Sequence, residues 1–367
     1  MRADDRRDPV SGRITTFDDF RDAVTGYRLP RILIAAVEID LFSTIGVASW
    51  AITDLAREMK VSERGLAILC RNLAMAGLLK KQGEIYRNSR LGATALNAHH
   101  PDYRGDYLRL ITNHWADWAR LPESVKSGLP LGHDKPEEPD YRRRFTWAMH
   151  QRTLGTAPKV AAQINLRGAR TLLDLGGGPG TYAMAFLAKN PALRATVCDR
   201  PAALEVAKEI ASTHKAGARL SCLPLDLLTE DIPGTYDVMW YSNVLHIYSP
   251  EDNQALFRRA LAALNPGGRL LIQDAFLHDP EGLFPEEASL FAVSMLLFTD
   301  RGDTYKTADT RSWLIDAGFD RVRALRMKKG TEDWEDGILE ARSPGRNVEM
   351  RDRRTKSVKS SRSRLSH

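Results

Sequence analysis

Apolar and polar positions change their spacing along the chain, and the change separates two kinds of structure. From residue 170 onward, short apolar runs alternate with helical stretches, a pattern typical of a parallel sheet with helices packed on it. The expected strands are 171–175, 195–199, 219–225, 237–242 and 269–276, with helices at 203–214 and 251–264 and a closing hairpin at 321–327 and 337–341. We therefore predict an α/β fold with a doubly wound, mostly parallel sheet that ends in an antiparallel hairpin.

The first hundred residues have a different, mainly helical pattern. A helix at 54–60 is followed by a short turn, in which Ser62 is expected to cap a second helix at 63–76. Apolar side chains recur on that second helix at helical spacing: Leu66, Leu69, Cys70 and Leu73. Residues 77–86 then form a hairpin that turns at Gly83. Helix, turn, helix and hairpin together predict a winged helix.

These patterns divide the chain into five segments. They are a disordered start at 1–16, a winged-helix domain at 17–102, a helical bridge at 103–166, a sheet domain at 167–342 and a disordered basic tail at 343–367. Residues 342–367 hold nine Lys/Arg, two Asp/Glu and few apolar side chains, a composition typical of disorder. Their net +7 accounts for the net +6 of the chain, so the folded part is close to neutral. A solvated extension is favoured over a role in binding nucleic acid or membrane.

Composition narrows the class of protein. With 43% hydrophobic and 27% charged residues over 367 positions, the chain is typical of a globular protein of roughly two domains. No apolar run is long enough to span a bilayer, and the charged start lacks the apolar segment of a secretory signal. The three cysteines lie far apart without metal-ligand spacing. We therefore expect free thiols, no metal and a cytoplasmic location.

A glycine-rich turn after the first expected strand carries the strongest chemical signal. Residues 171–182 are Thr-Leu-Leu-Asp-Leu-Gly-Gly-Gly-Pro-Gly-Thr-Tyr, an apolar strand followed by four glycines and then a helix expected from residue 183. Gly176, Gly178 and Gly180 allow the backbone to pass close beneath a nucleotide-like ligand. The N-terminus of the helix points to the same place, which favours a bound nucleotide-like cofactor.

Residues around the turn indicate which cofactor binds. Thr181 stands where a dinucleotide-binding turn would have its last glycine, and the acidic Asp174 precedes the turn, so S-adenosylmethionine with its charged amino acid tail is favoured. Asp199 ends the second strand, where a carboxylate can accept both hydroxyls of a ribose. Asp226 and Leu227, after the third strand, are candidates to contact the adenine. Capping of a turn is an almost equally favoured interpretation of Asp226.

The fourth strand is followed by the best candidate for a base. His246 lies just past its carboxyl end, the edge at which open α/β sheets bind ligands, and imidazole is well suited to remove a hydroxyl proton at neutral pH. Asp274, near the end of the fifth strand, can hydrogen-bond the other imidazole nitrogen, although a solvated acid is an equally favoured interpretation. The candidates for the walls of an aromatic substrate pocket are Trp115, Met149, Met295 and Phe298. Core packing is the simpler interpretation of each of these four.

Taken together, these motifs resemble the S-adenosylmethionine-dependent O-methyltransferases of the caffeic acid and acetylserotonin type, in their bacterial form. The resemblance covers about residues 18–342. Its most specific parts are residues 172–180, Asn-Val-Leu-His at 243–246, Leu-Asn-Pro-Gly-Gly-Arg-Leu-Leu-Ile at 264–272 and Trp-Leu-Ile-Asp-Ala-Gly-Phe at 313–319. It implies a winged-helix domain used for dimerisation and not for DNA binding, a seven-stranded class I methyltransferase sheet and a homodimer.

The resemblance also implies roles for individual residues. By matching position, Gly176, Asp199, Asp226 and Leu227 are cofactor contacts, His246 is the general base, and Asp274 replaces a glutamate that supports the histidine in plant members. Two positions depart from the plant pattern. Ser242 stands where a lysine helps to hold the cofactor, and Thr304 stands about where a second glutamate supports the histidine, with Asp303 one position away.

The sequence therefore predicts a cytoplasmic, homodimeric methyltransferase of secondary metabolism that acts on a hydroxyl of a small aromatic or phenolic acceptor. Methylation of carbon or nitrogen, or use of the cofactor without methyl transfer, are alternatives on the same fold. A DNA-binding regulator is less favoured, because the expected recognition helix carries only Arg64 and Arg71 as basic residues. A nicotinamide dehydrogenase is disfavoured by Thr181 and by the closing hairpin.

Overall fold

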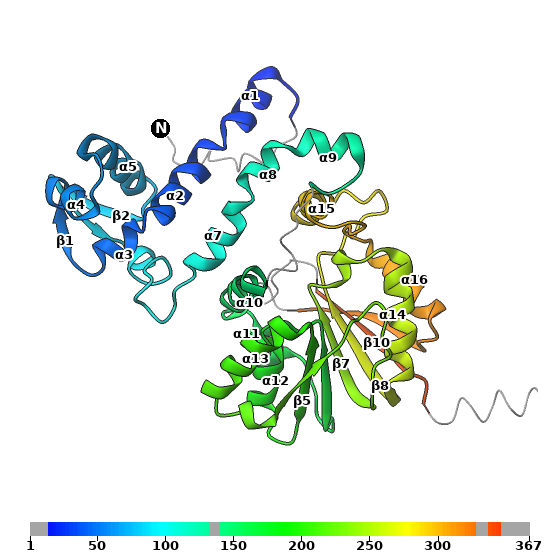
Figure 1. Ribbon diagram of the computed structural model, residues 1–367. Coiled ribbons are helices and arrows are strands. Elements are labelled where there is room, and N and C mark those ends of the chain that lie inside the picture. The colour runs from blue at the N-terminus through cyan, green and yellow to red at the C-terminus, as the bar shows by residue number, and fades with distance from the viewer. Residues whose placement is uncertain (1–13, 132–138, 328–336, 346–367) are drawn as a thin grey trace, which may run out of the picture. The chain divides into compact units, whose positions relative to one another are not determined.

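Two compact units make up the chain, with the division between Trp115 and Ala116. The structure, a computed structural model, describes residues 14–131, 139–327 and 337–345. Figure 1 shows the first unit in blue and cyan, as helices around a small sheet, and the second as a larger sheet with helices on both faces. The segment expected as a helical bridge, 103–166, is divided between the units, because its first helix belongs to the N-terminal one.

The N-terminal unit is a winged helix preceded by further helices. Its elements are α1 (Phe17–Thr25), α2 (Arg28–Glu38), α3 (Leu41–Ile45), β1 (Ser49–Ala51), α4 (Ile52–Met59), α5 (Glu63–Met75), β2 (Leu79–Gln82), β3 (Ile85–Asn88), α6 (Arg90–Ala93) and α7 (Gly105–Asn113), and α8 (Trp115–Ala119) crosses the division. The strands are antiparallel in the order β1-β3-β2. Ser62 caps α5 by accepting a hydrogen bond from the Gly65 N–H at 3.3 Å, and Gly83 turns the hairpin with a φ of +56°. The predicted winged helix, cap and turn are confirmed.

The start of the first unit is ordered closer to the N-terminus than expected. Thr16 and Asp19 form a reciprocal cap at the beginning of α1, in which each side chain accepts a hydrogen bond from the backbone N–H of the other residue. Residues 14–16 therefore belong to the described structure, although we expected disorder over 1–16. Residues 1–13 lie outside the described residues.

The second unit contains a seven-stranded sheet. Its elements are α9 (Leu121–Ser127), α10 (Pro139–Thr153), α11 (Ala157–Gln163), β4 (Thr171–Leu175), α12 (Thr181–Lys189), β5 (Arg194–Asp199), α13 (Pro201–Thr213), η1 (Gly217–Arg219), β6 (Leu220–Pro224), β7 (Tyr236–Ser242), η2 (Leu245–Ile247), α14 (Pro250–Ala262), β8 (Leu264–Gln273), α15 (Glu286–Phe298), α16 (Thr307–Asp316), β9 (Arg321–Leu325) and β10 (Ile338–Arg342). The strand order is β6-β5-β4-β7-β8-β10-β9. Neighbours from β6 to β8 are parallel, and β10 is antiparallel to both β8 and β9. The predicted sheet and closing hairpin are confirmed.

Several element boundaries differ from the expected ones by a few residues, and three of the differences have a local reason. Helix α12 begins at Thr181 and not at 183, because Gly180 caps it with a φ of +68°. Strand β8 begins at Leu264 and not at 269, since the pairing with β7 skips over residues 265–268 in an irregularity. It ends before Asp274, whose carboxylate accepts a hydrogen bond from the next N–H and turns the chain.

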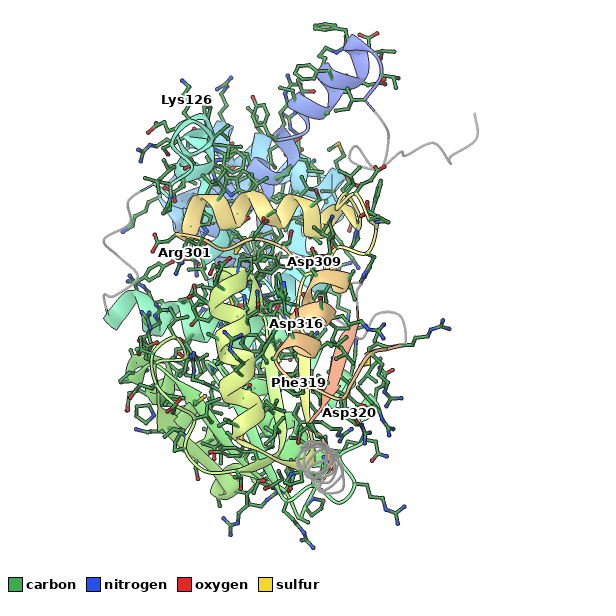
Figure 2. All side chains as sticks on the ribbon, turned by 90° about the vertical axis from the view of Figure 1, so that its right-hand side faces the viewer. Lys126, Arg301, Asp309, Asp316, Phe319 and Asp320 are labelled. Carbon is green, nitrogen blue, oxygen red and sulfur yellow. The ribbon has the colours of Figure 1, made fainter. Side chains whose placement is uncertain are left out.

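Side chains alternate between the two faces of the sheet and bury both. Leu172, Trp240 and Leu271 pack with α11 and α12 in one core cluster. Leu173 and Leu270 pack in the other cluster, together with side chains of α14 and α16. Figure 2 shows part of this second face, where Phe319 follows α16 and is 3% exposed. After β4 the chain adds β5 and β6 on one side of it and then β7 and β8 on the other. In an open parallel sheet, ligands bind at the carboxyl end of the strand where this order reverses, which here is β4.

The C-terminal end of the described chain packs against the sheet. The N–H of Ser343 donates to the Gly268 carbonyl at 2.9 Å, and the N–H of Gly267 donates to the Pro344 carbonyl at 3.3 Å. Residues 343–345, which we expected to begin a disordered tail, are therefore part of the described structure, and the rest of that tail, 346–367, lies outside it. Over the described ranges, no helix has the length and apolar character needed to cross a membrane.

Candidate active site

The glycine turn after β4 has three glycines with positive φ. At Gly176, φ is +65° and a Cβ would come within 2.9 Å of Val244 Cγ2. At Gly180, φ is +68° and a Cβ would come within 3.0 Å of Val197 Cγ2. Both glycines are therefore needed for the protein's own packing and backbone conformation, a reason that adds to the expected approach of a ligand.

Gly178 is the glycine of the turn that faces open space. Its φ is +50°, and the one atom within 4 Å of where a Cβ would lie, among the described residues, is Oδ2 of Asp199 at 3.9 Å. The Gly178 N–H donates to that oxygen at 2.8 Å, and the Arg200 N–H donates to Oδ1 at 2.7 Å. Burial raises the pKa of Asp199, and these two N–H groups oppose the rise. Each carboxylate oxygen keeps a lone pair, so the geometry suits acceptance of two ribose hydroxyls.

Asp174 lies directly beneath the turn with an unpaired acceptor. It is 2% exposed, and a Cβ on Gly177 would lie 2.4 Å from its carboxyl carbon. Its Oδ2 has no hydrogen-bond partner among the described residues. Burial raises the pKa of Asp174 to about 7, the Ala183 N–H opposes this rise, and the charge of Asp199 adds to it. A buried carboxylate oxygen of this kind suits a cationic ligand group.

Leu227 and Asp226 are placed differently from each other. Leu227 is 5% exposed, and its Cδ1 lies 3.4 Å from the Cβ position of Gly176, so it packs against the glycine turn. Asp226 is exposed, its Oδ1 accepts a hydrogen bond from the Leu228 N–H at 2.8 Å, and its own N–H donates to Glu230 Oε2 at 2.6 Å. The described contacts of Asp226 are thus those of a turn, and an adenine contact stays a prediction.

His246 and Asp274 form a buried pair at the carboxyl ends of β7 and β8. His246 Nδ1 lies 2.7 Å from Asp274 Oδ1, and the two residues are 7% and 1% exposed. The carboxylate is held by the N–H groups of Val244, at 3.1 Å from Oδ2, and Ala275, at 2.7 Å from Oδ1. Because a carboxylate only accepts, Nδ1 carries the proton of a neutral imidazole and Nε2 keeps its lone pair.

Two further segments hold the histidine in place. The ring of Phe291 on α15 meets the imidazole edge to face, with 4.8 Å between centroids. The Asp303 N–H donates to the His246 carbonyl at 3.0 Å, and a Cβ on Gly302 would lie 2.3 Å from that same oxygen. Thr304, where the resemblance places a second glutamate, is 5% exposed, and its Oγ1 is unpaired among the described residues. Within this part of the chain, the carboxylate hydrogen-bonded to His246 is that of Asp274.

Ser242 belongs to a chain of polar side chains that sequence reasoning did not identify. Its Oγ accepts from Asn243 Nδ2 at 2.9 Å and donates to Gln273 Oε1 at 3.3 Å. Arg152 Nη2, on α10, lies 3.5 Å from Asn243 Oδ1. The sequence held one signal for this chain of side chains. Gln273 is a polar residue directly after three apolar positions of an inner strand, where a polar side chain needs a partner.

The expected pocket walls come from three helices. Met149 is half-buried on α10, Met295 is 6% exposed on α15, and Phe298 is half-buried on the same helix. Met295 is four residues after Phe291, so it lies on the face of α15 that contacts His246. Trp115 is 42% exposed and belongs to the first unit, where the guanidinium of Arg31 lies 6.0 Å from its ring centroid. Trp115 thus belongs to the first unit, and the other three residues belong to the second.

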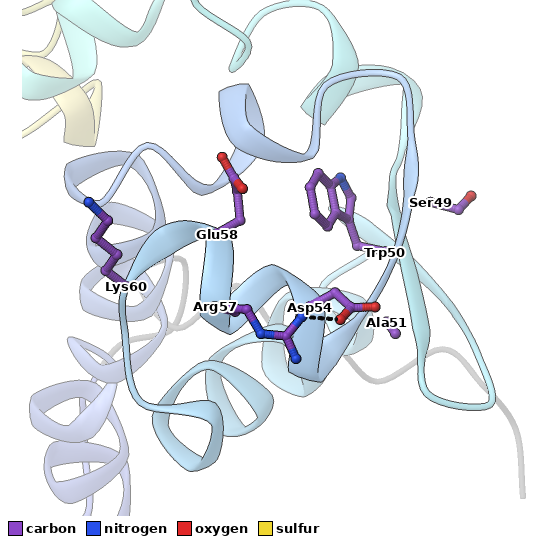
Figure 3. A pocket seen from close by; sticks show the side chains of 7 residues that line it. All are labelled: Ser49, Trp50, Ala51, Asp54, Arg57, Glu58 and Lys60. Carbon is purple, nitrogen blue, oxygen red and sulfur yellow. Dashed lines mark hydrogen bonds and ion pairs between the residues drawn. The ribbon is translucent and has the colours of Figure 1, made fainter.

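A pocket on the first unit is unrelated to the expected chemistry. It has a volume of about 480 Å³ and is lined by Ser49, Trp50, Ala51, Asp54, Arg57, Glu58 and Lys60. Figure 3 shows Arg57 pointing to Asp54, to which it is paired at 2.8 Å. None of the predicted site residues lines it, so it has no part in the site that we describe.

The sheet order, with an antiparallel last strand pair, is that of class I methyltransferases. A family model of the O-methyltransferase domain matches residues 125–320, and a model of the O-methyltransferase dimerisation domain matches residues 22–98. The first match covers more than half of the sequence, and the chain belongs to the O-methyltransferase family. The winged-helix unit is therefore the dimerisation domain, which supports the predicted homodimer.

Known proteins similar to this chain agree with the family. The 3-hydroxy-5-methyl-1-naphthoate 3-O-methyltransferase of Streptomyces sahachiroi is 29% identical over 316 residues, which cover 83% of this chain and 90% of that protein. The tetracenomycin polyketide synthesis 8-O-methyl transferase of Streptomyces glaucescens is 30% identical over 305 residues, 81% of this chain and 89% of that protein. The crystal structure of human N-acetylserotonin methyltransferase in complex with S-adenosylmethionine has the same fold, with a TM-score of 0.79 and 21% identity over 91% of this chain and 99% of that chain.

S-adenosylmethionine is the cofactor of this family, which confirms the cofactor predicted from the glycine turn. The residues at the carboxyl end of β4 fit it. Because Gly178 has no Cβ, the space above it stays open for a ligand. Asp174 offers a buried, unpaired acceptor oxygen to a cationic group. The roles of the individual residues remain predictions.

Proposed function

We propose that this enzyme transfers the methyl group of S-adenosylmethionine to a hydroxyl of a small aromatic, phenolic acceptor, with His246 as general base. The observation that carries the proposal is the 2.7 Å hydrogen bond between His246 Nδ1 and Asp274 Oδ1. The bond leaves Nε2 as the acceptor nitrogen of a neutral imidazole at the ligand-binding edge of the sheet. This tautomer is the one that can take a proton from a hydroxyl.

Four residues are proposed to hold the cofactor, whose sulfonium supplies an electrophilic methyl group. Gly178 gives the backbone its close approach, Asp199 accepts the ribose hydroxyls, Leu227 lies against the adenine and Asp174 accepts from the α-ammonium. Gly176, Gly180, Asp226 and Ser242 complete the set of predicted cofactor contacts. Fixing the acceptor oxygen in line with the methyl group lowers the barrier by roughly 7–11 kcal/mol in well-oriented systems.

His246 and Asp274 move and stabilise the proton. His246 Nε2 would accept the hydrogen of the acceptor hydroxyl as that oxygen bonds to the methyl carbon, and the sulfur of a bound S-adenosylmethionine would keep the electron pair of the bond that breaks. The Asp274 carboxylate then stabilises the imidazolium, which later returns the proton to solvent. A positioned base of this kind contributes typically ~10²–10⁴ in rate.

The aromatic nature of the acceptor is supported by the side chains near the histidine and by a relative. Phe291 contacts His246, and Met295 lies on the same face of α15, so an aromatic ring lies beside the base and a flexible thioether lies one helical turn further along. Met149, Phe298 and Trp115 are the remaining predicted walls. The S. sahachiroi relative is named for a hydroxynaphthoate, which is an acceptor of this chemical class.

Product analysis tests the proposal. The protein is incubated with S-adenosylmethionine labelled in its methyl group and with a series of hydroxylated naphthoates and phenols. We expect labelled aryl methyl ether, and label on carbon or nitrogen would identify one of the alternative reactions. A thermal-shift comparison is expected to show stabilisation by S-adenosylmethionine and none by NAD. A cytoplasmic location and the absence of a nucleic-acid partner stay predictions.

A further inference from the structure

The last residue of strand β8 is a buried amide with an unpaired donor. Gln273 is 1% exposed, and its Nε2 has no hydrogen-bond partner among the described residues. The three preceding residues, 270–272, are fully buried and apolar. A buried amide donor without a partner is costly, and native proteins rarely keep one unless water or a ligand pairs with it.

The hydrogen bonds of Ser242 fix the orientation of that amide. Asn243 Nδ2 donates to Ser242 Oγ at 2.9 Å, and Ser242 gives its single hydroxyl proton to Gln273 Oε1 at 3.3 Å. The carbonyl of Gln273 is thereby engaged, so its NH₂ group is the part left to bind something else.

Gln273 lies on the same edge and face of the sheet as the cofactor turn. Ser242 is paired in register with Gln273, and Leu175, the residue before the glycine turn, is paired with Tyr241, the residue before Ser242. Leu172 and Leu271 belong to the core cluster on the α12 face, and alternation places Asp174 and Gln273 on that same face. Since β7 alone separates β4 from β8, the two backbones are about 10 Å apart, which two side chains and a small ligand group can span.

The polar groups gathered there have complementary signs. Gln273 Nε2 is an unpaired donor, Arg152 brings a guanidinium to within 3.5 Å of Asn243 Oδ1, and Asp174 Oδ2 is an unpaired acceptor, all among the described residues. We propose that Gln273, assisted by Arg152, binds the α-carboxylate of the methionine part of the cofactor, while Asp174 binds its α-ammonium. This assignment rests on the proposed function, and it makes Gln273 a positioning residue that sets where the methyl group lies.

Calorimetry with two ligands tests this assignment without turnover. S-adenosylhomocysteine and its decarboxylated analogue differ only in the carboxylate. In the parent protein we expect the first to bind more tightly. Gln273→Met removes the donor and keeps the length of the side chain, so it should weaken S-adenosylhomocysteine about tenfold and change the analogue less than about twofold. Arg152→Met, on partly buried α10, should act in the same direction and serves as the second variant.

Leu271→Met is the matched control, because it introduces the same side chain on the same face two residues earlier in β8. It should affect both ligands equally. Equal weakening of the two ligands by Gln273→Met, or no weakening, would overturn the assignment and leave the proposed function standing. Unchanged S-adenosylhomocysteine affinity with a raised KM for the acceptor would assign the amide to the acceptor instead. A parent protein with no affinity for S-adenosylhomocysteine would contradict the proposed function itself.

Discussion

His246 Nδ1 lies 2.7 Å from Asp274 Oδ1, and both residues are almost fully buried. The same carboxylate accepts hydrogen bonds from two backbone N–H groups, so its position is fixed from the strand side as well as from the ring side. A buried pair of this kind sets the tautomer of the imidazole and stabilises its charged form. Substitution of Asp274 with His246 unchanged therefore measures what the carboxylate contributes to turnover, separately from the imidazole.

Asp274→Asn should lower kcat by about 10²–10⁴ and leave the affinity for S-adenosylhomocysteine within about twofold. The asparagine amide can turn its NH₂ group toward Nδ1, where the carboxylate could only accept a hydrogen bond. Nδ1 then need not carry the proton, so Nε2 no longer has to be the acceptor nitrogen. A neutral amide also no longer stabilises the imidazolium. Steady-state kinetics and calorimetry measure the two quantities.

Asp303→Asn is the matched control for the neighbouring carboxylate. The side chain of Asp303 is exposed and accepts from the Thr304 N–H at 2.7 Å, with no hydrogen bond to the imidazole among the described contacts. We expect kcat within about threefold of the parent value. A loss comparable to that of Asp274→Asn would mean that Asp303 takes the place of the second glutamate of the plant enzymes.

Gly178→Val should abolish binding of S-adenosylhomocysteine, because the new side chain fills the open space above the turn. The substitution should also destabilise the fold, because φ is positive at this position and valine tolerates such a backbone poorly. Gly168→Val imposes a similar backbone cost, since φ is +89° there and no atom of the described residues lies within 4 Å of the Cβ position. The control is expected to lower the melting temperature without loss of affinity. A binding isotherm of Gly178→Val that matches the parent would refute the proposed position of the cofactor.

The free energy of unfolding should depend on the ionisation of Asp174. Burial raises its pKa to about 7 from an ordinary value of 3.8, so the ligand-free folded protein holds this proton more tightly than the unfolded chain. The stabilising contribution is fully present below pH 3.8 and is lost as the pH rises through 7. Asp174→Asn removes this dependence. At pH 8 the variant should be the more stable protein, with a free energy of unfolding about 2–4 kcal/mol above that of the parent. Denaturant titrations at pH 5 and pH 8 measure the difference.

Ligand affinity should show the opposite trend with pH. An α-ammonium favours the ionised carboxylate, so the affinity for S-adenosylhomocysteine should rise between pH 5.5 and pH 8, by up to about tenfold per unit below pH 7. Asp174→Asn should bind more weakly at pH 8 and should lose most of this slope. An unchanged slope in the variant would mean that Asp174 does not face the ligand.

Residues whose position follows from the end of a strand were predictable, and those whose position depends on other side-chain contacts were not. The glycine turn, the strand-end Asp199 and the pair of His246 with a strand-five acid all follow from where strands end in a parallel sheet. The short hydrogen bond of Gly178 to Asp199 confirms that these two predicted residues meet. By contrast, the unpaired amide of Gln273 depends on the face of β8 on which it lies and on the hydroxyl that occupies its carbonyl.

Helix α10 shows why the rest of the site could not be read from the sequence. Its charged and aromatic residues follow no single apolar face, so spacing alone did not indicate that Arg152 approaches Asn243, 91 positions later. The irregular start of β8 had a similar origin. Its Asn-Pro-Gly-Gly segment has the composition of a turn, yet the strand continues through it because the pairing with β7 resumes on the other side.

One measurement addresses the central claim directly: transfer of labelled methyl from S-adenosylmethionine to the oxygen of a hydroxynaphthoate, compared between the parent protein and His246→Ala at matched cofactor occupancy. We predict that the parent forms the labelled ether and that the variant loses about 10²–10⁴ of the rate while its affinity for S-adenosylhomocysteine stays within about twofold. Equal rates of ether formation by the two proteins would contradict the account.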